Sequence, residues 1–245
     1  MILALILSVY LFYGSSYIIY SISGIVLIYL VLIISGSGLI QLNYFVKSIN
    51  KGSGKGVAIT FDDGPDAQTT PQILAILAKE NIKATFFVIG HKIEANKELL
   101  QRIHYEGHTV GNHSFSHTKK LTSSSTNLLR ADFLKCSKSI EYVINEKPIF
   151  FRPPFGVTNP RYKRAIIALS LKSIGWSIRS LDTKTNNAKQ LYNSLIKKIS
   201  KGSIILFHDT QKVTVEVLPQ IIEHCKNNGI KIVPLPQLIN ERPYE

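Results

Sequence analysis

The chain is predicted to be an α/β protein with a parallel sheet covered by helices, preceded by a membrane-anchoring segment. Two observations predict this. Short apolar runs alternate with helical patterns throughout residues 56–245, which is typical of a parallel sheet with helices outside it. Residues 1–46 contain no Asp, Glu, Lys, Arg or His. We therefore place a domain boundary after residue 46 and interpret the polar residues 47–55, rich in Gly and Ser, as a flexible linker.

Each predicted strand of the globular part is a short apolar run, and each predicted helix has apolar residues at helical spacing. In the first helix, Thr69 or Thr70 can act as the cap, with Pro71 at the first position. The predicted strands are residues 57–61, 84–89, 108–110, 149–151, 173–176, 203–206 and 230–233. The predicted helices are residues 70–79, 96–106, 126–145, 160–171, 188–199, 215–227 and 235–239.

The apolar N-terminal segment is long enough to cross a membrane. Residues 17–34 match the roughly 20 residues needed for a hydrocarbon layer of about 30 Å, and the shorter run 1–13 allows a second span. A cleaved signal peptide is disfavoured, because the start lacks Lys and Arg and the apolar stretch is too long. The lysines in residues 47–55 favour a cytoplasmic position for this end. Because long domains often override that rule, we expect a cell-membrane protein whose globular domain lies on the extracellular side.

A formal net charge of +13 raises the question of an anionic partner. The basic residues occur singly or in pairs, without a long basic run interleaved with aromatic residues, so nucleic acid is not predicted as a partner. A lysine-rich solvated surface and attraction to an anionic cell wall both remain open. Cys136 and Cys225 are too few for a disulfide scaffold and lack metal-ligand spacing. They are expected as small buried residues, and whether they pair is left open.

Two adjacent carboxylates, Asp62 and Asp63, close the first predicted strand. Such a pair is costly unless a cation binds it. Neighbouring side chains on a strand point to opposite sides, so one carboxylate could bind a metal while the other stays free as a base. The alternative is a solvated Asp-Asp-Gly-Pro turn.

His113 and His117 follow the third predicted strand. At i and i+4 they would face the same side of a helical turn, a spacing that suits one metal ion. With Asp63 they form a His-His-carboxylate set that leaves coordination positions open for water and substrate. The alternative is two exposed loop histidines.

Two further polar clusters follow later strands. In the run from Arg152 to Phe155, two prolines remove N–H groups, so the first backbone donor is that of Phe155, which can serve an oxyanion, while Arg152 can pair with a carboxylate. His208 lies just past a buried strand and is a candidate general acid, with Asp182 as another candidate polar residue. For each, a structural role on its own is the alternative.

Together these residues resemble the polysaccharide deacetylases of carbohydrate esterase family 4, the NodB homology domain. The resemblance covers roughly residues 55–240. It is carried by TFDDGP at 60–65, HSFSH at 113–117, RPPF at 152–155, Asp182, and LFH at 206–208. It implies a distorted (β/α)7-type barrel. It also implies one divalent metal ion held by Asp63, His113 and His117. Zinc is the expected ion, and cobalt or another divalent ion is the alternative.

The resemblance further implies the roles of the remaining site residues. Asp62 would be the general base, held by Arg152, and Asp182 would orient a protonated His208 as general acid. Leu206 would line the methyl side of the acetyl pocket, and the Phe155 N–H would bind the oxyanion. The chain departs from the family at Thr183, where a tryptophan of the acetyl pocket is common.

The expected function is removal of N-acetyl groups from N-acetylglucosamine-type sugars in peptidoglycan, a chitin-like oligomer or poly-N-acetylglucosamine. The alternatives are O-deacetylation of acetylated xylan or a similar glycan, and an inactive carbohydrate-binding membrane protein. A metal-dependent phosphoesterase is disfavoured because the chain lacks a phosphate-cradling Gly-rich loop. The complete TFDDGP points away from deacetylases that form muramic lactam. The oligomeric state is left open.

Overall fold

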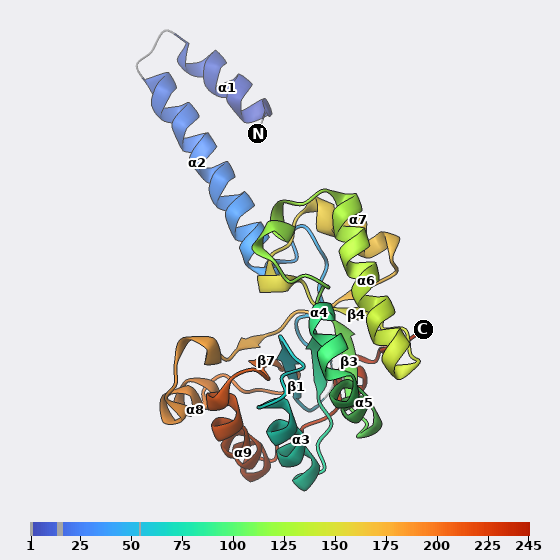
Figure 1. Cartoon of the computed structure of the whole chain (residues 1–245). Helices are drawn as coiled ribbons and strands as arrows, with labels where there is room; N and C mark the ends of the chain where they lie inside the picture. Colours follow the sequence, from blue (N-terminus) through green and yellow to red (C-terminus); the bar gives the residue numbers. More distant parts are fainter. Residues whose placement is uncertain (1, 14–16, 54) are drawn as a thin grey trace.

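A computed structural model describes residues 2–13, 17–53 and 55–245 of the chain. Figure 1 shows a globular domain from which one long helix projects, with a shorter helix folded back beside it. The α-helices are α1 (Ile2–Phe12), α2 (Tyr17–Gly38), α3 (Thr70–Lys79), α4 (Gly90–Ile93), α5 (Lys97–Tyr105), α6 (Thr126–Ile144), α7 (Pro160–Ala168), α8 (Ala188–Ile196), α9 (Lys212–Asn227) and α10 (Leu235–Ile239). Short 3-10 helices are η1 (Ile40–Leu42), η2 (Glu94–Asn96), η3 (Lys119–Ser123), η4 (Pro154–Gly156) and η5 (Asp182–Lys184).

The domain is built on one parallel sheet of seven strands in the order β5-β4-β3-β2-β1-β7-β6. The strands are β1 (Ala58–Asp62), β2 (Thr85–Val88), β3 (Thr109–Asn112), β4 (Phe150–Phe151), β5 (Lys172–Ser173), β6 (Ile178–Arg179) and β7 (Ile204–His208). Every pairing is parallel, so all the strands end at the same edge of the sheet.

The chain connectivity forces this sheet to curl. Its two edge strands, β5 and β6, are consecutive in sequence, and only residues 174–177 separate them. That link can span at most about 18 Å, whereas the edges of a flat seven-stranded sheet lie about 29 Å apart. The sheet therefore bends back on itself, which confirms the predicted distorted (β/α)7-type barrel.

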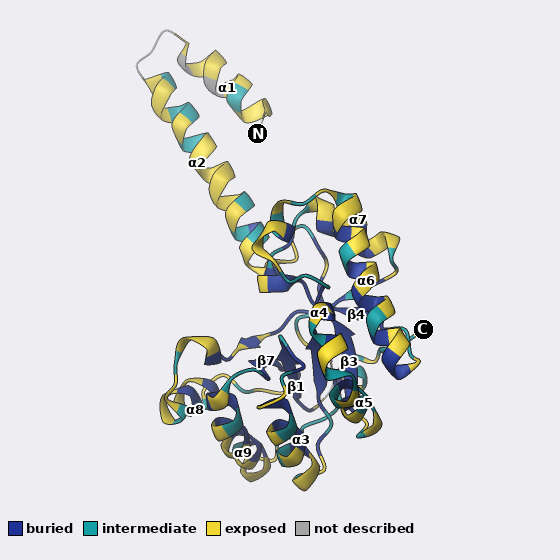
Figure 2. Cartoon of the chain, viewed as in Figure 1, coloured by how far each residue is buried: buried dark blue, intermediate teal, exposed yellow. Residues whose placement is uncertain are grey.

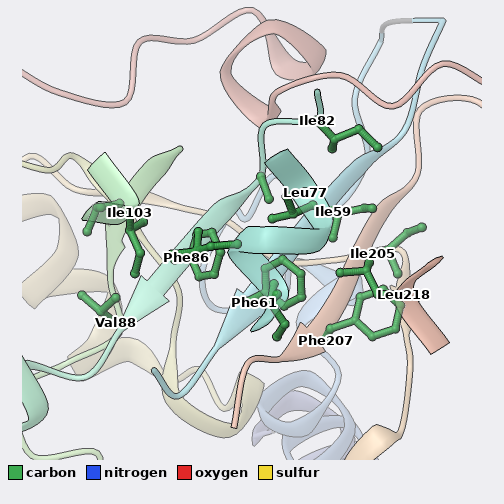
Figure 3. Packing of buried hydrophobic residues seen from close by; sticks show 14 of the residues in the cluster. Ile59, Phe61, Leu77, Ile82, Phe86, Val88, Ile103, Ile205, Phe207 and Leu218 are labelled. Atoms are coloured by element: carbon green, nitrogen blue, oxygen red, sulfur yellow. The ribbon is translucent and has the colours of Figure 1, made fainter. Parts of the chain in front are cut away.

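The strands bury both of their faces, as expected for a parallel sheet. On β1 and β7, alternate residues such as Ile59, Phe61 and Phe207 pack outward against the helices. Figure 3 shows this layer, with Phe61, Phe86 and Phe207 side by side. The residues between them point into the barrel, where Ala58 and Leu206 join a second cluster with Trp176. Asp62 and His208 have the inward parity, so the strand period directs both into the interior.

Most predicted elements are confirmed within a few residues, but one predicted strand is wrong and one strand was not predicted. Residues 230–233 do not form a strand: Ile232 makes a single bridge with Val57. Pro234 follows and has no N–H with which to extend the ladder. The missing strand is β6, whose two residues are too short to show a period. Both cysteines are buried and free, as expected of small core residues.

The segment expected to link the two parts lies against the domain. Ile49 bridges to Ile174, and Lys51 bridges to Ser203. The hydroxyls of Ser48 and Ser173 are hydrogen bonded at 2.7 Å. Residues 47–53 are therefore packed along the sheet in this structure.

The N-terminal helices differ in length. α2 has 22 residues with a mean hydropathy of 2.5 over its most apolar window, long and apolar enough to cross a membrane. Figure 2 shows its surface exposed along nearly its whole length. α1 has 11 residues, which span only about 17 Å.

Candidate active site

The motifs predicted to carry chemistry meet at the carboxyl edge of the sheet. β1 ends at Asp62 and β7 at His208, and these two residues are directly paired in the strand register. β3 ends at Asn112, one residue before His113, and Asn112 is paired with Phe151, one residue before Arg152. The register alone thus brings four of the predicted residues to one place, where sites form in parallel α/β folds.

Asp63, His113 and His117 form a cluster whose ligand atoms all lie within 4.8 Å of one another. Asp63 Oδ1 is 3.5 Å from His113 Nε2 and 3.3 Å from His117 Nε2. His117 Nε2 is buried and has no hydrogen-bond partner among the described residues. A buried nitrogen without a partner is costly, which indicates that this cluster accommodates a further group.

Two of the geometric arguments made from the sequence were wrong, although the residues do meet. Residues 113–117 form a loop and no helical turn, and backbone φ is positive at both Ser114 (67°) and His117 (46°). Asp63 lies just beyond β1 with φ 73°, so strand alternation does not set its direction. Its side chain therefore points to the same site as that of Asp62, whose Oδ2 lies 3.7 Å from His113 Nε2.

Two residues that sequence reasoning missed hold this strained loop in place. Asp132 of α6 accepts hydrogen bonds from the Phe115 N–H at 2.8 Å and from the Ser116 N–H at 3.0 Å. Asn112 accepts from the Ser114 N–H at 2.8 Å through its side-chain oxygen. No local sequence pattern links Asp132 to a loop 16 residues earlier, so only the fold reveals its role.

Asp62 is held by a buried arginine. The guanidinium of Arg152, with no exposed surface, donates from Nη1 to Asp62 Oδ1 at 2.8 Å and to Thr60 Oγ1 at 2.8 Å. It also donates to the carbonyl oxygens of Ile174 and Gly175. Its plane lies over the Phe87 ring at 4.1 Å. These partners satisfy a charge that would otherwise be costly to bury, and they fix the Asp62 carboxylate.

Asp182 holds His208 by two hydrogen bonds, and a third hydrogen bond fixes Asp182 itself. Asp182 Oδ1 accepts from His208 Nδ1–H at 2.7 Å, and Oδ2 accepts from the His208 backbone N–H at 2.7 Å. The buried Thr214 hydroxyl, not anticipated from sequence, donates to Oδ2 at 2.7 Å. The Nε2 atom of His208 is left facing the cluster, 3.9 Å from Asp63 Oδ2.

The protonation states follow from these contacts. Burial alone would raise the pKa of Asp63, but its hydrogen bond to His113 and the nearby imidazoles hold that pKa well below its usual range. Burial, together with the charge of His113, lowers the pKa of His117 to about 4. Burial opposes a charge on His208, yet the Asp182 carboxylate raises the pKa of His208 above its ordinary value.

The cluster fits a divalent metal ion. The Nδ1–H of His113 donates to the Arg152 carbonyl oxygen at 2.8 Å, so Nε2 is the nitrogen that faces Asp63 and would bind an ion in place of its proton. Such a backbone partner commonly orients a metal-binding histidine. Two imidazole nitrogens and one carboxylate oxygen are a donor set that suits zinc and leaves positions open for water and substrate. The neutral His117 and ionised Asp63 are the forms that bind a metal.

The remaining predicted residues lie near this cluster. The Phe155 ring packs 4.7 Å from the His117 ring, and Phe155 takes the left-handed conformation at φ 60°. The Phe155 N–H has no acceptor within the described part of the chain. Leu206 lies on the inward face of β7, two residues before His208. Thr183 is exposed beside Asp182.

The comparisons with known proteins agree with this geometry. Residues 49–174 match the model of the polysaccharide deacetylase family, and the chain belongs to this family. It is 35% identical over 190 residues to a peptidoglycan-N-acetylglucosamine deacetylase, PgdA, of Listeria monocytogenes, covering 78% of this chain and 40% of the relative. The chain thus spans less than half the length of that curated relative.

Solved structures give the same result. The Bc1960 peptidoglycan N-acetylglucosamine deacetylase superposes with a TM-score of 0.76 at 31% identity, covering 80% of this chain and 94% of that one. BA3943, a family 4 pseudoenzyme from Bacillus anthracis, superposes with a TM-score of 0.74 at 28% identity, covering 78% and 68%. The fold therefore hosts inactive members as well, so activity must be argued from the site residues.

Proposed function

We propose that the chain is a metal-dependent hydrolase that removes N-acetyl groups from N-acetylglucosamine-type sugars, with peptidoglycan as the substrate class. The proposal is carried by one arrangement: the Asp63–His113–His117 donor set lies beside Asp62, a second carboxylate held by Arg152. A binding protein would need neither a base fixed in this way nor an acid such as His208. The peptidoglycan activity in the names of PgdA and Bc1960 supports the substrate class.

The expected reaction is hydrolysis of the acetamide. A divalent ion, when bound, would polarise the acetamide carbonyl and make a water molecule more acidic. Asp62, fixed by Arg152, takes a proton from the attacking water. The N–H of Phe155 is available to the oxyanion that develops on the substrate, with Leu206 on the methyl side. His208, kept protonated by Asp182, gives a proton to the leaving nitrogen, so that acetate and a free amine are released.

Acetate release tests this proposal. The full chain in detergent would be assayed on N-acetylglucosamine oligomers, on isolated peptidoglycan and on acetylated xylan, with a chelator and after zinc is added back. We expect release from an N-acetylated substrate that stops with chelator and returns with zinc. Release from xylan alone would establish O-deacetylation instead. Glycan binding without acetate release from any substrate would establish the inactive alternative.

We further propose that α2 anchors the protein in a cell membrane and that the catalytic domain, residues 56–245, lies on the extracellular side, where the polysaccharide is. The support is the length and apolar character of α2. Residues 1–46 form the proposed anchor, with 47–55 as the junction. Protease treatment of intact cells tests the side: loss of the catalytic domain from the cell-bound protein is expected, and its survival until lysis would place the domain inside.

A further inference from the structure

The proposed anchor helix joins the domain without a spacer. Ile34 is the last strongly exposed apolar residue of α2. Only three residues later, the Ser37 carbonyl accepts from the Thr158 N–H at 3.0 Å, and the Ser37 hydroxyl donates to the Thr158 carbonyl at 2.8 Å. Gly36 is buried so closely that an added Cβ would lie 2.6 Å from the Tyr44 ring. At about 1.5 Å per helical residue, the domain surface begins within a few ångströms of the apolar stretch.

Three chain segments surround this junction, and we call them the exit lobe: residues 35–47, 116–131 and 153–169. Figure 1 shows α7 and the loops before α6 beside the end of α2. Hydrogen bonds connect the second and third segments: Asn159 Nδ2 donates to the Thr122 carbonyl, and Arg161 Nη1 donates to the Ser123 carbonyl, both at 2.9 Å. Lys47 and Lys163 line a common hollow that connects the first segment to the third.

The exit lobe carries an excess of positive charge, although Asp132 binds the Ser116 N–H at its edge and Glu241 lines the hollow beside Lys47 and Lys163. Its three segments contain no Asp or Glu and seven exposed basic residues, against a net charge of +13 for the whole chain. These residues are Lys47, Lys119, Lys120, Arg130, Arg161, Lys163 and Arg164. About half of the net charge therefore lies in less than a fifth of the residues, although the sequence shows only scattered single and paired lysines and arginines.

The same surface exposes large apolar side chains directly after α2. Leu39 is 51%, Leu42 56% and Tyr44 54% exposed. In water, the exposed parts of these side chains stay hydrated and contribute no hydrophobic stabilisation. At a membrane interface, Tyr and Leu enter the boundary between headgroups and acyl chains, while Lys and Arg meet anionic headgroups. The combination is typical of a surface that lies on a bilayer.

We infer that the exit lobe binds the surface of an anionic membrane and thereby holds the domain down on the bilayer. The inference rests on the proposal that α2 spans that membrane. It goes beyond anchoring, because a chain can be anchored and still let its domain stand away from the lipid. The choice of lipid over a soluble anionic polymer follows from the exposed Leu39, Leu42 and Tyr44 and from their continuity with α2.

Membrane contact at this surface would set where the active site can act. His117 and Phe155, whose rings are 4.7 Å apart, both belong to segments of the exit lobe. The candidate active site therefore lies at the margin of the lobe, close to the end of α2. A domain bound in this way reaches glycan strands near the membrane and is kept from the outer layers of a wall.

Hydrogen exchange of the full chain in lipid nanodiscs tests the inference. Exchange would be compared between anionic phosphatidylglycerol discs and zwitterionic phosphatidylcholine discs. We expect backbone amides in residues 118–125 and 157–164 to exchange about tenfold more slowly in the anionic discs, since the basic residues of the lobe are attracted to such a surface. High salt should remove this difference. Equal exchange in the two lipids would overturn the inference.

A matched pair of variants locates the contact. The first carries Lys119→Glu, Lys120→Glu and Lys163→Glu, and should lose the protection. The second carries Lys197→Glu, Lys198→Glu and Lys201→Glu, the same charge change at exposed positions after α8, and should keep it. Figure 1 places α8 at the far end of the domain from α2. Equal loss in both variants would show a general charge effect and would contradict a specific surface.

Two further measurements separate the assumptions. Flotation with vesicles after high-salt and carbonate washing tests the anchor by itself: a chain that stays behind would overturn both the anchor and the membrane contact. Acetate release in detergent tests the chemistry without any membrane, so its failure leaves the lipid contact intact. Protection by soluble polyphosphate in zwitterionic discs, without protection by anionic lipid, would assign the exit lobe to an anionic polymer instead.

Discussion

Asp132 should control metal affinity although it does not reach the metal site. Its two carboxylate oxygens accept the N–H groups of Phe115 and Ser116, in the middle of the loop that carries His113 and His117. In the variant Asp132→Asn, one oxygen becomes an NH2 group. That group faces an N–H donor, so one hydrogen bond is lost and two donors are opposed.

The size of the effect follows from what the loop must offset. Residues held at unusual backbone angles cost about 1–3 kcal/mol each, and the loop has two, Ser114 and His117. A hydrogen bond to a charged group contributes about 1.5–3 kcal/mol, so losing one removes about half of the support from Asp132. We expect about 2 kcal/mol of weaker binding, or about a 30-fold rise in the zinc dissociation constant, within the range for residues that support metal ligands.

Competition between the protein and a zinc-binding indicator measures this constant. The control is Glu141→Gln, which removes the same charge from an exposed position on the same helix and should bind zinc like the parent. Far-ultraviolet circular dichroism would verify that both variants are folded. Unchanged zinc affinity in Asp132→Asn would refute the argument that these two hydrogen bonds hold the ligands in position.

Three other substitutions give distinct results. Asp62→Asn keeps an acceptor for Arg152 but removes the base, so acetate release should fall about 100- to 10 000-fold. Its zinc content, measured by mass spectrometry, should be unchanged. A mild loss of acetate release would contradict the assignment of Asp62 as the base. Thr214→Val removes one bond to Asp182 and should lower kcat about tenfold with little change in KM; a change in KM alone would oppose a positioning role. Burial lowers the pKa of His108 to about 4 from 6.5. As pH falls, His108 is therefore protonated in the unfolded chain before it is protonated in the folded chain. Folding stability is lost between about pH 6.5 and about pH 4. His108→Asn, which can still accept the Ala84 N–H, should remove about 3 kcal/mol of this pH dependence in urea unfolding, and an unchanged dependence would show that His108 is not its source.

The sequence predicted the location of the site more reliably than its geometry. Parallel strands end at one edge, so apolar runs followed by polar residues were enough to bring Asp62 and His208 together. The orientation of Asp63, His113 and His117 could not be predicted, because it depends on three positive φ angles. Those angles are maintained by partners distant in sequence, such as Asp132, which leave no local pattern. The two residues of β6 are likewise too few to show a period.

Arg152 explains why the proposed metal ligands and the proposed base form one unit. Its guanidinium fixes Asp62, and its backbone carbonyl accepts the Nδ1–H of His113. Both contacts arise at the end of β4, which has only two residues but is fully buried. A displacement of this strand end would disturb His113 and Asp62 together, because both are hydrogen bonded to Arg152. Four acceptors stabilise the buried charge of Arg152, and the same hydrogen bonds preserve the spacing between His113 and Asp62. A hydrophobic residue in place of Arg152 could fill the same volume but would not preserve that spacing.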